Sequence, residues 1–534
     1  ETPKPFEAGP IRTPVCSSDV FASTADDGYG YKWEYDSAGT ATASASPGLV
    51  VGADGANWKN RGPFRVKTPP DAQKLFGNVP NGTRVMIDGL NFSGDGKGFE
   101  ADIVASGGLT GNVNVKPIDK PYVSTLHRKG TDAEILANCI AVARRSGCYS
   151  VHLHDKGTPW DIKSDAETLP GDIFFFAQKG KRVIVRSNPD TPDPAEAWPA
   201  GMINYVFRQT TTQTGGGLEN IEVQCNDKVW ASGVRVEGTE CTIINCLISD
   251  ATAKRRFDPV LTIDDPDNPG NQIPKPVNGF VLMSINSTAS GTKIVNNKFL
   301  RGHNQLVCNS GAEDLLIHGN NFYDYYLRGW NLLVNNTVDS HRGPWVLDNN
   351  VFRSPAVSGD GTKQPLSVNA AVAAQTELLP AGLYVTNNKL FLSGDAHDAS
   401  PPIISNRGTA DAMNFHYTTD AIIDGNSVRG GGELGLTLSY NCESCMVSNN
   451  FMVDCHLGGY STSAGQDGSI QKHIWFINNI AIDAAANELD DTGIALGNFY
   501  FWKLESPVIS GNKSYVFNND QSKPWLITDF DVIY

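Results

Sequence analysis

Three carboxylates in the second half of the chain have the types and spacing that cleavage of a glycosidic bond requires. Asp395 and Glu433 each follow an Asn of a repeat by seven residues (388 to 395, 426 to 433), and Asp398 lies close to the first. In a solenoid, residues at matching positions in adjacent coils lie about 4.8 Å apart. In glycoside hydrolysis one carboxylic acid protonates the leaving oxygen, and a second carboxylate acts on water or on the sugar. We predict Glu433 as the acid and Asp395 or Asp398 as the base; the alternative is that they are ordinary turn carboxylates.

A second group of candidate residues is mainly aromatic and basic. Aromatic rings stack on sugar rings, and Arg pairs with uronate or sialate carboxylates, so this group predicts a glycan groove. It also fits a lyase, in which His303 or Tyr326 takes a proton beside a carboxylate and Arg328 neutralises the developing charge. The alternative is that the aromatic rings stack in the core and the Arg side chains are solvated. The predicted substrate-binding residues are Arg301, His303, Asp324, Tyr326, Arg328, Trp330, His341 and Arg342.

A repeated phrase sets the register in which these residues would meet. It consists of an apolar residue, any residue, a bend position that is Asn or Gly, and a final Asn. This final Asn is Asn297, Asn320, Asn350, Asn388, Asn426, Asn450, Asn479 or Asn512. Gly and Asn tolerate a left-handed backbone, so each copy predicts a bend between two short strands. The following Asn can stack on its equivalents as an amide ladder. The copies are 23 (297 to 320) to 38 (388 to 426) residues apart, which suits coils with loops of variable length. We predict an all-β chain folded as a right-handed parallel β-helix; the alternative is a β-sandwich with chance Asn pairs.

The chain divides into four predicted segments. Residues 1–120 predict a β-rich N-terminal module, 121–217 a capping helix with the first strands, and 218–520 the β-helix. The helix begins with a capping box, Thr131 to Glu134, and ends at Gly147. We expect it to cover the open end of the solenoid. The apolar tail, 521–534, would cap the last coil or contact a neighbouring subunit.

Composition narrows the classes of partner. The net charge of −15 argues against nucleic acid, and no run of 18 apolar residues exists that would insert into a membrane. The chain begins at Glu1 without Met, so either a signal peptide was removed or the chain is part of a longer protein. The ten Cys suit interior packing, and Cys442 and Cys445 have metal-like spacing without a second pair. We predict no metal and no cofactor. The Pro- and Asp-rich stretch between Asp250 and Gly279 predicts a loop, in which calcium binding is a weak alternative.

A β-rich module, a capped helix and a ladder of Asn-bearing coils resemble the phage tailspike depolymerases and the pectate-lyase-like polysaccharide lyases and hydrolases. The resemblance covers about residues 125–520. The usual Gly-Asp-Gly-x-x-Asp-Asp-Thr before the helix is absent, and Arg128-Lys-Gly-Thr-Asp132 stands in its place. The resemblance implies a bacterial surface polysaccharide as substrate, a homotrimer, and an extracellular location on a virion tail or as a secreted enzyme.

Three functions stay open at this point. The first is a tailspike that cleaves a bacterial surface polysaccharide by hydrolysis. The second is a lyase that acts on an acidic glycan, and the third is an adhesin that only holds glycan. An ultraviolet-absorbing unsaturated product distinguishes the second function, and release of reducing ends excludes the third.

Overall fold

The structure is a computed structural model of the whole chain, and it divides into two compact units. Unit 1 comprises Glu1–Asp155 and Ile173–Gln178, and unit 2 comprises Lys156–Asp172 and Lys179–Tyr534. The residues that it describes are 24–26, 32–35, 49–51, 57–60, 64–66, 69–74, 81, 83–87, 99–106, 115–117, 122–126, 130–181, 183–187, 204–226, 232–251, 256–264, 272–277, 281–309, 311–334, 343–354, 364–370, 382–392, 411–430, 434–455, 458–463, 470–482, 498–515 and 526–528.

Unit 1 holds the predicted β-rich module and the predicted helix. Its first sheet has the strand order β1-β2-β4-β3 and its second the order β5-β6-β7-β8. These strands are β1 (Thr24–Asp26), β2 (Lys32–Tyr35), β3 (Leu49–Val51), β4 (Asn57–Asn60), β5 (Phe64–Val66), β6 (Thr83–Ile87), β7 (Phe99–Ile103) and β8 (Val115–Pro117).

Helix α2 (Asp132–Ser146) has the ends that the sequence predicts. The Thr131 hydroxyl accepts from the Glu134 backbone N–H, and the Glu134 carboxylate accepts from the Thr131 backbone N–H. Gly147 ends the helix with a left-handed backbone, φ 74°. The apolar side of α2 packs on β9 (Val123–Ser124) and β10 (Ser150–His152), with Leu136 and Cys139 buried. Parallel pairing joins β10 to β13 (Phe174–Phe176).

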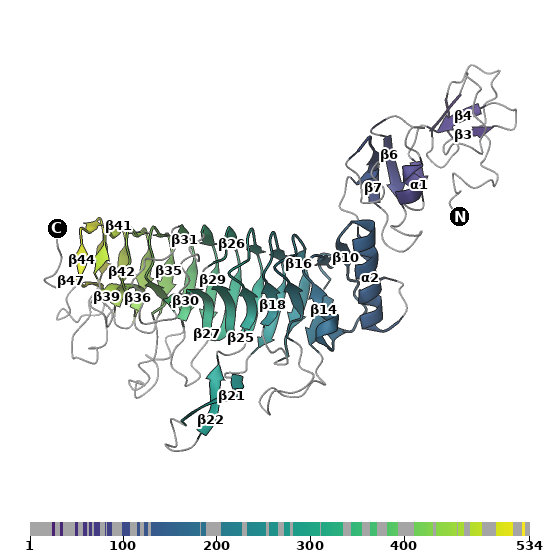
Figure 1. Cartoon of the computed structure of the whole chain (residues 1–534). Helices are drawn as coiled ribbons and strands as arrows, with labels where there is room; N and C mark the ends of the chain where they lie inside the picture. The colour runs from purple at the N-terminus through teal and green to yellow at the C-terminus, as the bar shows by residue number, and fades with distance from the viewer. Residues whose placement is uncertain are drawn as a thin grey trace. The chain divides into compact units, whose positions relative to one another are not determined.

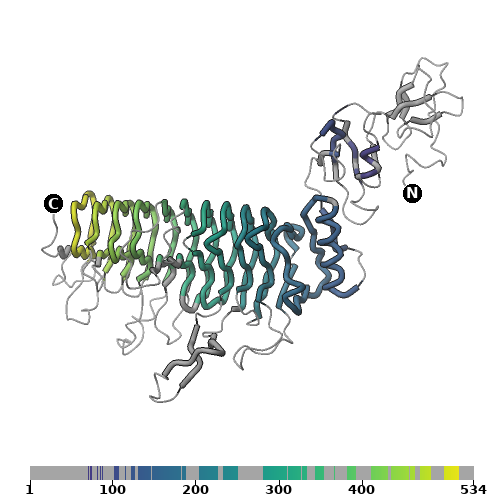
Figure 2. The backbone as a smooth tube through the Cα atoms, viewed as in Figure 1, coloured from purple at the N-terminus to yellow at the C-terminus, as the bar shows by residue number. Residues whose placement is uncertain are grey.

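Unit 2 is a parallel β-helix with three strand-bearing faces, which confirms the predicted fold class. Its successive coils stack side by side (Figures 1 and 2). Face A precedes the Asn bend in each coil, and its strands pair in parallel with one another. It comprises β16 (Gly217–Glu219), β19 (Thr242–Ile244), β24 (Lys293–Val295), β26 (Leu315–His318), β28 (Trp345–Asp348), β31 (Leu383–Thr386), β34 (Ile422–Asp424), β37 (Met446–Ser448), β41 (Trp475–Ile477) and β45 (Val508–Ser510).

Face B follows the Asn bend. Together with face C it forms a 22-stranded sheet, because β25 (Lys298–Asn309) and β27 (Asn321–Val334) run from one face into the other. The remaining strands of face B are β11 (Trp160–Ile162), β14 (Val183–Ser187), β17 (Ile221–Gln224), β20 (Leu247–Ala251), β29 (Val351–Ser354), β32 (Lys389–Leu392), β35 (Ser427–Arg429), β38 (Phe451–Val453), β42 (Ile480–Ile482) and β46 (Lys513–Tyr515).

Face C completes each coil. It comprises β12 (Leu169–Pro170), β15 (Phe207–Gln209), β18 (Ser232–Val236), β23 (Val281–Ile285), the second halves of β25 and β27, β30 (Gln364–Ala370), β33 (Met413–His416), β36 (Leu434–Ser439), β39 (Gly458–Ser463), β43 (Phe499–Phe501) and β47 (Leu526–Thr528). The parallel sheet therefore reaches back to Trp160, ahead of the predicted first coil at Leu218. The C-terminal tail contributes β47, which pairs with β43.

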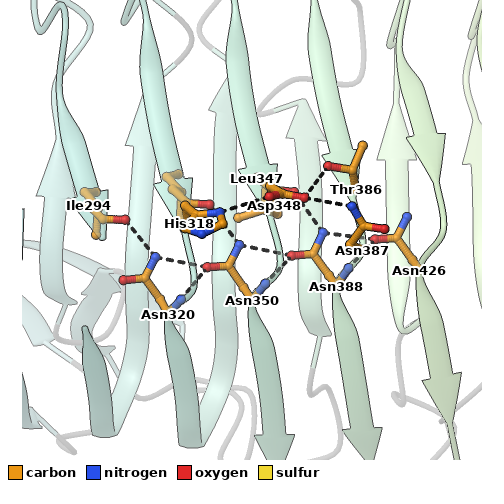
Figure 3. A network of polar contacts seen from close by, with 11 residues as sticks. Ile294, His318, Asn320, Leu347, Asp348, Asn350, Thr386, Asn387, Asn388 and Asn426 are labelled. Atoms are coloured by element: carbon orange, nitrogen blue, oxygen red, sulfur yellow. Dashed lines mark hydrogen bonds and ion pairs between the residues drawn. The ribbon is translucent and has the colours of Figure 1, made fainter. Parts of the chain in front are cut away.

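The predicted amide ladder is present and continuous. Each ladder Asn donates from Nδ2 to the Oδ1 of the next, as in Asn320 to Asn350 (3.0 Å), Asn350 to Asn388 (3.0 Å) and Asn388 to Asn426 (2.9 Å) (Figure 3). The same Nδ2 also donates to a main-chain carbonyl of an adjacent coil, such as Leu347 for Asn388 (2.8 Å). Because the ladder side chains from Asn297 to Asn479 are buried, these bonds replace water for their amides. One coil earlier Cys246 takes the ladder position, and its N–H donates to Asn297 Oδ1 (2.8 Å).

The bend position before each ladder Asn has the predicted left-handed backbone. The φ values are 56° at Asn296, 68° at Gly319, 52° at Asn349 and 56° at Asn387, and the later copies match them. The apolar residue two positions after each ladder Asn from Asn297 to Asn479 is buried in the coil, and the last copy has Ser514 there. Phe299, Phe322 and Phe352 stack there with ring centroids 4.8 and 4.6 Å apart.

Two further expectations can be compared with the structure. The stretch between Asp250 and Gly279 was expected to be a loop, but it contains an antiparallel pair, β21 (Arg256–Asp264) and β22 (Gln272–Val277). The four Cys predicted to be interior, Cys225, Cys241, Cys246 and Cys308, are all buried. In the part of the chain that the structure describes, no helix is long and apolar enough to cross a membrane.

Candidate functional site

Face C presents a row of small polar side chains on the side away from the core. In β27, β33 and β36 the residues Trp330, Met413 and Leu436 are in register and fully buried among the apolar side chains of the coil. Successive side chains of a strand point to opposite sides, so the next residue in each strand points outward. These outward residues are Asn331, Asn414, Thr437 and Ser461. Asn414 pairs in register with Thr437 and Thr437 with Ser461, and the backbone of Ser367 lies in register between Asn331 and Asn414.

This outward row is nevertheless buried. Asn414 is 7% exposed and Thr437 is 3% exposed. Among the described residues, neither Asn414 Oδ1 nor Thr437 Oγ1 has a hydrogen-bond partner. A buried polar group without a partner costs about 1–3 kcal/mol. The two oxygens, on adjacent strands, are therefore hydrogen-bond acceptors whose partners the described residues do not supply.

A histidine extends this row, and the charge of an arginine acts on it. His416 lies two residues after Asn414, on the same side of β33, and burial lowers its pKa to about 4, with the nearby Arg328 charge adding to the effect. The imidazole is therefore neutral at neutral pH and can accept a proton. Burial also lowers the pKa of Arg328, but a guanidinium stays charged at any physiological pH.

Asp411 lies in the same coil, two residues before β33 begins. It is 8% exposed. The N–H of its neighbour Ala412 donates to the carbonyl of Leu434 in the next coil (2.8 Å). In the sequence, Asp411 directly precedes the donor residue Ala412, and Glu433 directly precedes the acceptor residue Leu434. We call Arg328, Asn331, Asp411, Asn414, His416 and Thr437 the face C patch.

The backbone is strained where the patch ends. Tyr417, Tyr440 and Asn441 have φ values of 50°, 57° and 52°, in the left-handed region that bulky residues avoid. The rings of Tyr417 and Tyr440 stack with centroids 5.3 Å apart. Such strain persists only where the surroundings enforce it, and it concentrates at functional sites.

Arg301 and Asp324 lie in the bends between faces B and C. Both have left-handed φ, 52° and 58°, as does Asp250 with 67°. The strands on either side are in register, so the three side chains follow one another from coil to coil. Arg301 Nε lies 2.6 Å from Asp250 Oδ1. This pair stabilises the corner, and substrate binding by Arg301 and Asp324 stays a prediction.

Other predicted substrate-binding residues have different environments. Trp330 is 1% exposed and lies inside the coil, so it cannot contact a glycan outside it. The prediction that Trp330 binds substrate is therefore wrong, and its side chain packs in the core of the coil. His303 is half-buried in β25, and Tyr326 lies in β27 with a side chain outside the described residues. Arg328 belongs to the face C patch. The predicted Asp395, Asp398, Glu433, His341 and Arg342 lie outside the described residues, so their roles stay predictions.

The outward row of face C was not predicted from the sequence, although a signal exists. Its members follow the ladder Asn by eleven residues in three coils (320 to 331, 426 to 437, 450 to 461). Asn331 and Thr437 each lie between two apolar residues, and Ser461 lies between Tyr460 and Thr462. Longer connections shift the interval in the other coils, as in Asn388 to Asn414, and hide the pattern.

A polar network on face A shows how carboxylates stabilise the coils. Asp348 accepts from Thr386 Oγ1 (2.7 Å) and Asn387 Nδ2 (3.0 Å) of the next coil, and His318 Nδ1 lies 2.9 Å away (Figure 3). Burial alone would raise the pKa of Asp348, but these bonds outweigh it and the pKa lies below its usual value. Asp424 accepts in the same way from Ser448 and Asn449. The recurrence in two coils indicates a structural role.

The described residues do not group as metal ligands. Among them, no cluster of three or more His, Cys, Asp or Glu residues could hold a metal ion. Cys442 and Cys445 are fully buried, and their thiols donate to main-chain carbonyls such as those of Phe415 and Thr418. Burial raises the pKa of Cys442 to about 12, which favours the packing role over a thiolate ligand.

Comparisons with known proteins give distant structural likenesses. No family model matches the chain, and no curated protein matches it. The catalytic domain of a GH87 alpha-1,3-glucanase in complex with nigerose has a TM-score of 0.45 at 9% identity, covering 77% of this chain and 68% of that one. The tailspike protein of E. coli bacteriophage HK620 in complex with a hexasaccharide gives 0.44 at 11% identity, covering 76% and 80%. The A-module of the Azotobacter vinelandii mannuronan C-5 epimerase AlgE4 gives 0.41 at 13%, covering 75% and 96%. At these scores we carry no residue role over to this chain.

Proposed function

We propose that the chain is a glycan-active enzyme whose substrate binds at the face C patch. The observation that carries this proposal is the row of buried, outward-facing polar side chains on adjacent strands, with two oxygens that lack partners among the described residues. Sugars offer hydroxyl donors at short intervals, and a row of acceptors about 4.8 Å apart matches such a ligand.

The reaction that we propose is glycoside hydrolysis. Glu433 protonates the leaving oxygen, and Asp411 activates water or attacks the sugar carbon. Asp411 and Leu434 occupy matching positions in adjacent coils, and Glu433 precedes Leu434 in the sequence. The proposal requires the two carboxyl groups to lie about 5–5.5 Å apart for retention or about 6.5–9.5 Å apart for inversion. Asp411 thus joins the predicted bases Asp395 and Asp398, which remain alternatives for the same step.

A lyase reaction is the second candidate, because the patch also holds a cation beside a neutral imidazole. Arg328 would neutralise a uronate carboxylate, and His416 would take the proton next to it. In this reaction the glycosidic oxygen leaves with its bonding electrons as a double bond forms in the sugar.

The biological setting that we propose follows from the resemblance in sequence organisation. It is an extracellular depolymerase of a bacterial surface polysaccharide, carried on a phage tail as a homotrimer or secreted as an enzyme. The net charge of −15 is the reason for expecting no nucleic-acid partner.

Incubation with a panel of capsular and O-antigen polysaccharides tests the proposal. We expect release of reducing ends without ultraviolet-absorbing product. Glu433→Gln and Asp411→Asn should each lower turnover by a factor of at least about 100 and keep glycan binding. Asp420→Asn is the matched control, because Asp420 is exposed in the same coil with a φ of 50° that Asn tolerates.

Three outcomes would contradict hydrolysis at this site. Full activity of Glu433→Gln or Asp411→Asn removes that residue from the mechanism. An absorbing unsaturated product that requires His416 identifies the lyase. Binding of a polysaccharide without any cleavage identifies an adhesin.

A further inference from the structure

The outer side of face B carries a band of cations and aromatic rings that the proposed reaction does not use. The middle residue of each strand, such as Phe322, Phe352 or Leu390, is buried inside the coil, so the residues on either side of it point outward. We call these outward residues the face B band: Lys298, Tyr323, Arg353, Lys389, Phe391, Arg429, Phe451 and Lys513.

Rings and guanidinium groups alternate along one line of this band. Tyr323 pairs in register with Arg353, Arg353 with Phe391, and Phe391 with Arg429. Neighbours in this line are about 4.8 Å apart. Arg353 Cζ lies 5.2 Å from the centre of the Phe391 ring, within cation–π range. Tyr323 and Phe391 are each 38% exposed, so part of each ring remains accessible.

The charge of the band is unbalanced. Lys298, Arg353, Lys389, Arg429 and Lys513 are all exposed. None of them forms an ion pair with a described residue, and the described outward positions of face B from β25 to β46 include no carboxylate. The carboxylates nearest in sequence are those of Asp324 and Asp454, in the bends at the edge of the face. A positive strip is thus separated from the rest of a chain whose net charge is −15.

We infer that the face B band is a binding site for an acidic polysaccharide, separate from the face C patch. Cations bind the carboxylates of uronic or sialic acid units, and the exposed ring faces contact the sugar rings between them. From β25 to β46 the coils add up to roughly 34 Å, which suits an extended polymer. Binding here requires no cleavage, so the inference does not depend on the proposed reaction.

Affinity electrophoresis of the full chain tests this inference, with polygalacturonate in the gel and dextran as the neutral comparison. The band variant is Arg353→Gln, Lys389→Gln and Arg429→Gln together. The control variant is Lys163→Gln, Lys179→Gln and Lys181→Gln, which removes the same charge from exposed sites outside face B. We expect polygalacturonate to retard the unmodified chain, and added salt to weaken this retardation. The band variant should bind roughly tenfold more weakly, and the control should bind as the unmodified chain does.

Several results would overturn the inference. The first is that polygalacturonate does not retard the unmodified chain. The second is that both variants lose binding equally, and the third is that dextran retards the chain as strongly as polygalacturonate does. Tighter binding of single-stranded DNA than of polygalacturonate would assign the band to nucleic acid. A changed molecular mass of the band variant in light scattering would assign it to a subunit contact. A chain that binds polygalacturonate through the band but cleaves no polysaccharide would contradict the proposed reaction alone.

Discussion

The imidazole of His416 lies against the ring of Tyr440, with centroids 4.7 Å apart and planes at 66°. Burial, with the nearby charge of Arg328 adding to it, lowers the folded-state pKa of His416 to about 4, against 6.5 for a free side chain. In the unfolded chain the imidazole takes up a proton near pH 6.5. The stability that the neutral form contributes is therefore complete above that pH and is lost as the pH falls toward 4. The loss amounts to about 3 kcal/mol, from 1.36 kcal/mol per pKa unit.

His416→Gln should flatten this pH dependence. We expect the free energy of unfolding of the unmodified chain to decrease from pH 7 to pH 4.5 more steeply than that of the variant. Urea unfolding at a series of pH values measures this difference. His473→Asn is the control, because His473 is exposed. Parallel pH curves for the chain and the His416 variant would show that His416 is not the group responsible.

Thr437→Val should weaken substrate binding without lowering the stability of the fold. The Thr437 hydroxyl is buried without a partner among the described residues, so a methyl group of the same shape leaves the folding free energy unchanged or more favourable. If a sugar hydroxyl bonds to this oxygen, KM should rise about fivefold to tenfold, which corresponds to a hydrogen bond of about 1 kcal/mol. Thr462→Val is the contrasting variant, because Thr462 Oγ1 donates to the Trp502 carbonyl inside the coil (2.9 Å). It should lower Tm and leave KM unchanged.

Asn388→Ala should destabilise the β-helix strongly. It removes the Oδ1 that accepts from both the N–H and the Nδ2 of Asn350, and the Nδ2 that donates to Leu347 and Asn426. Buried groups left without partners give an expected loss of about 3–5 kcal/mol, visible as a lower denaturation midpoint. Asn321→Ala, at an exposed position of β27, should cost less than about 0.5 kcal/mol. Equal midpoints for the two variants would contradict the ladder's role in stability.

The proposed homotrimer predicts a molar mass of three chains in light scattering. One chain has a mass of 57.6 kDa. Removal of residues 521–534, which include β47, should shift the population toward single chains if the tail contacts a neighbouring subunit. A monomer for the full chain would contradict the tailspike setting and leave the reaction at face C untouched.

The ladder made the fold predictable, and the connections between strands limited prediction of the site. Each ladder phrase combines an apolar position, a left-handed position and an amide within four residues, so Asn297 and Asn320 were correctly matched as neighbours from local sequence alone. The capping box of α2 is local in the same way. The face C patch requires Asp411, Asn414 and Thr437 to be matched across connections of unequal length, which no local pattern specifies. Trp330 shows the same difficulty, because alternation in a strand decides between core and surface, and a shift by one residue reverses it.

The amide ladder has a consequence for how such a chain evolves. Asn388 and Asn426 are 38 residues apart, Asn426 and Asn450 are 24 apart, and both pairs are joined by hydrogen bonds of 2.9 Å. A connection can therefore gain or lose fourteen residues without altering the spacing of the scaffold. Selection can then exchange the segments at the corners, while the stack that supports them is inherited intact.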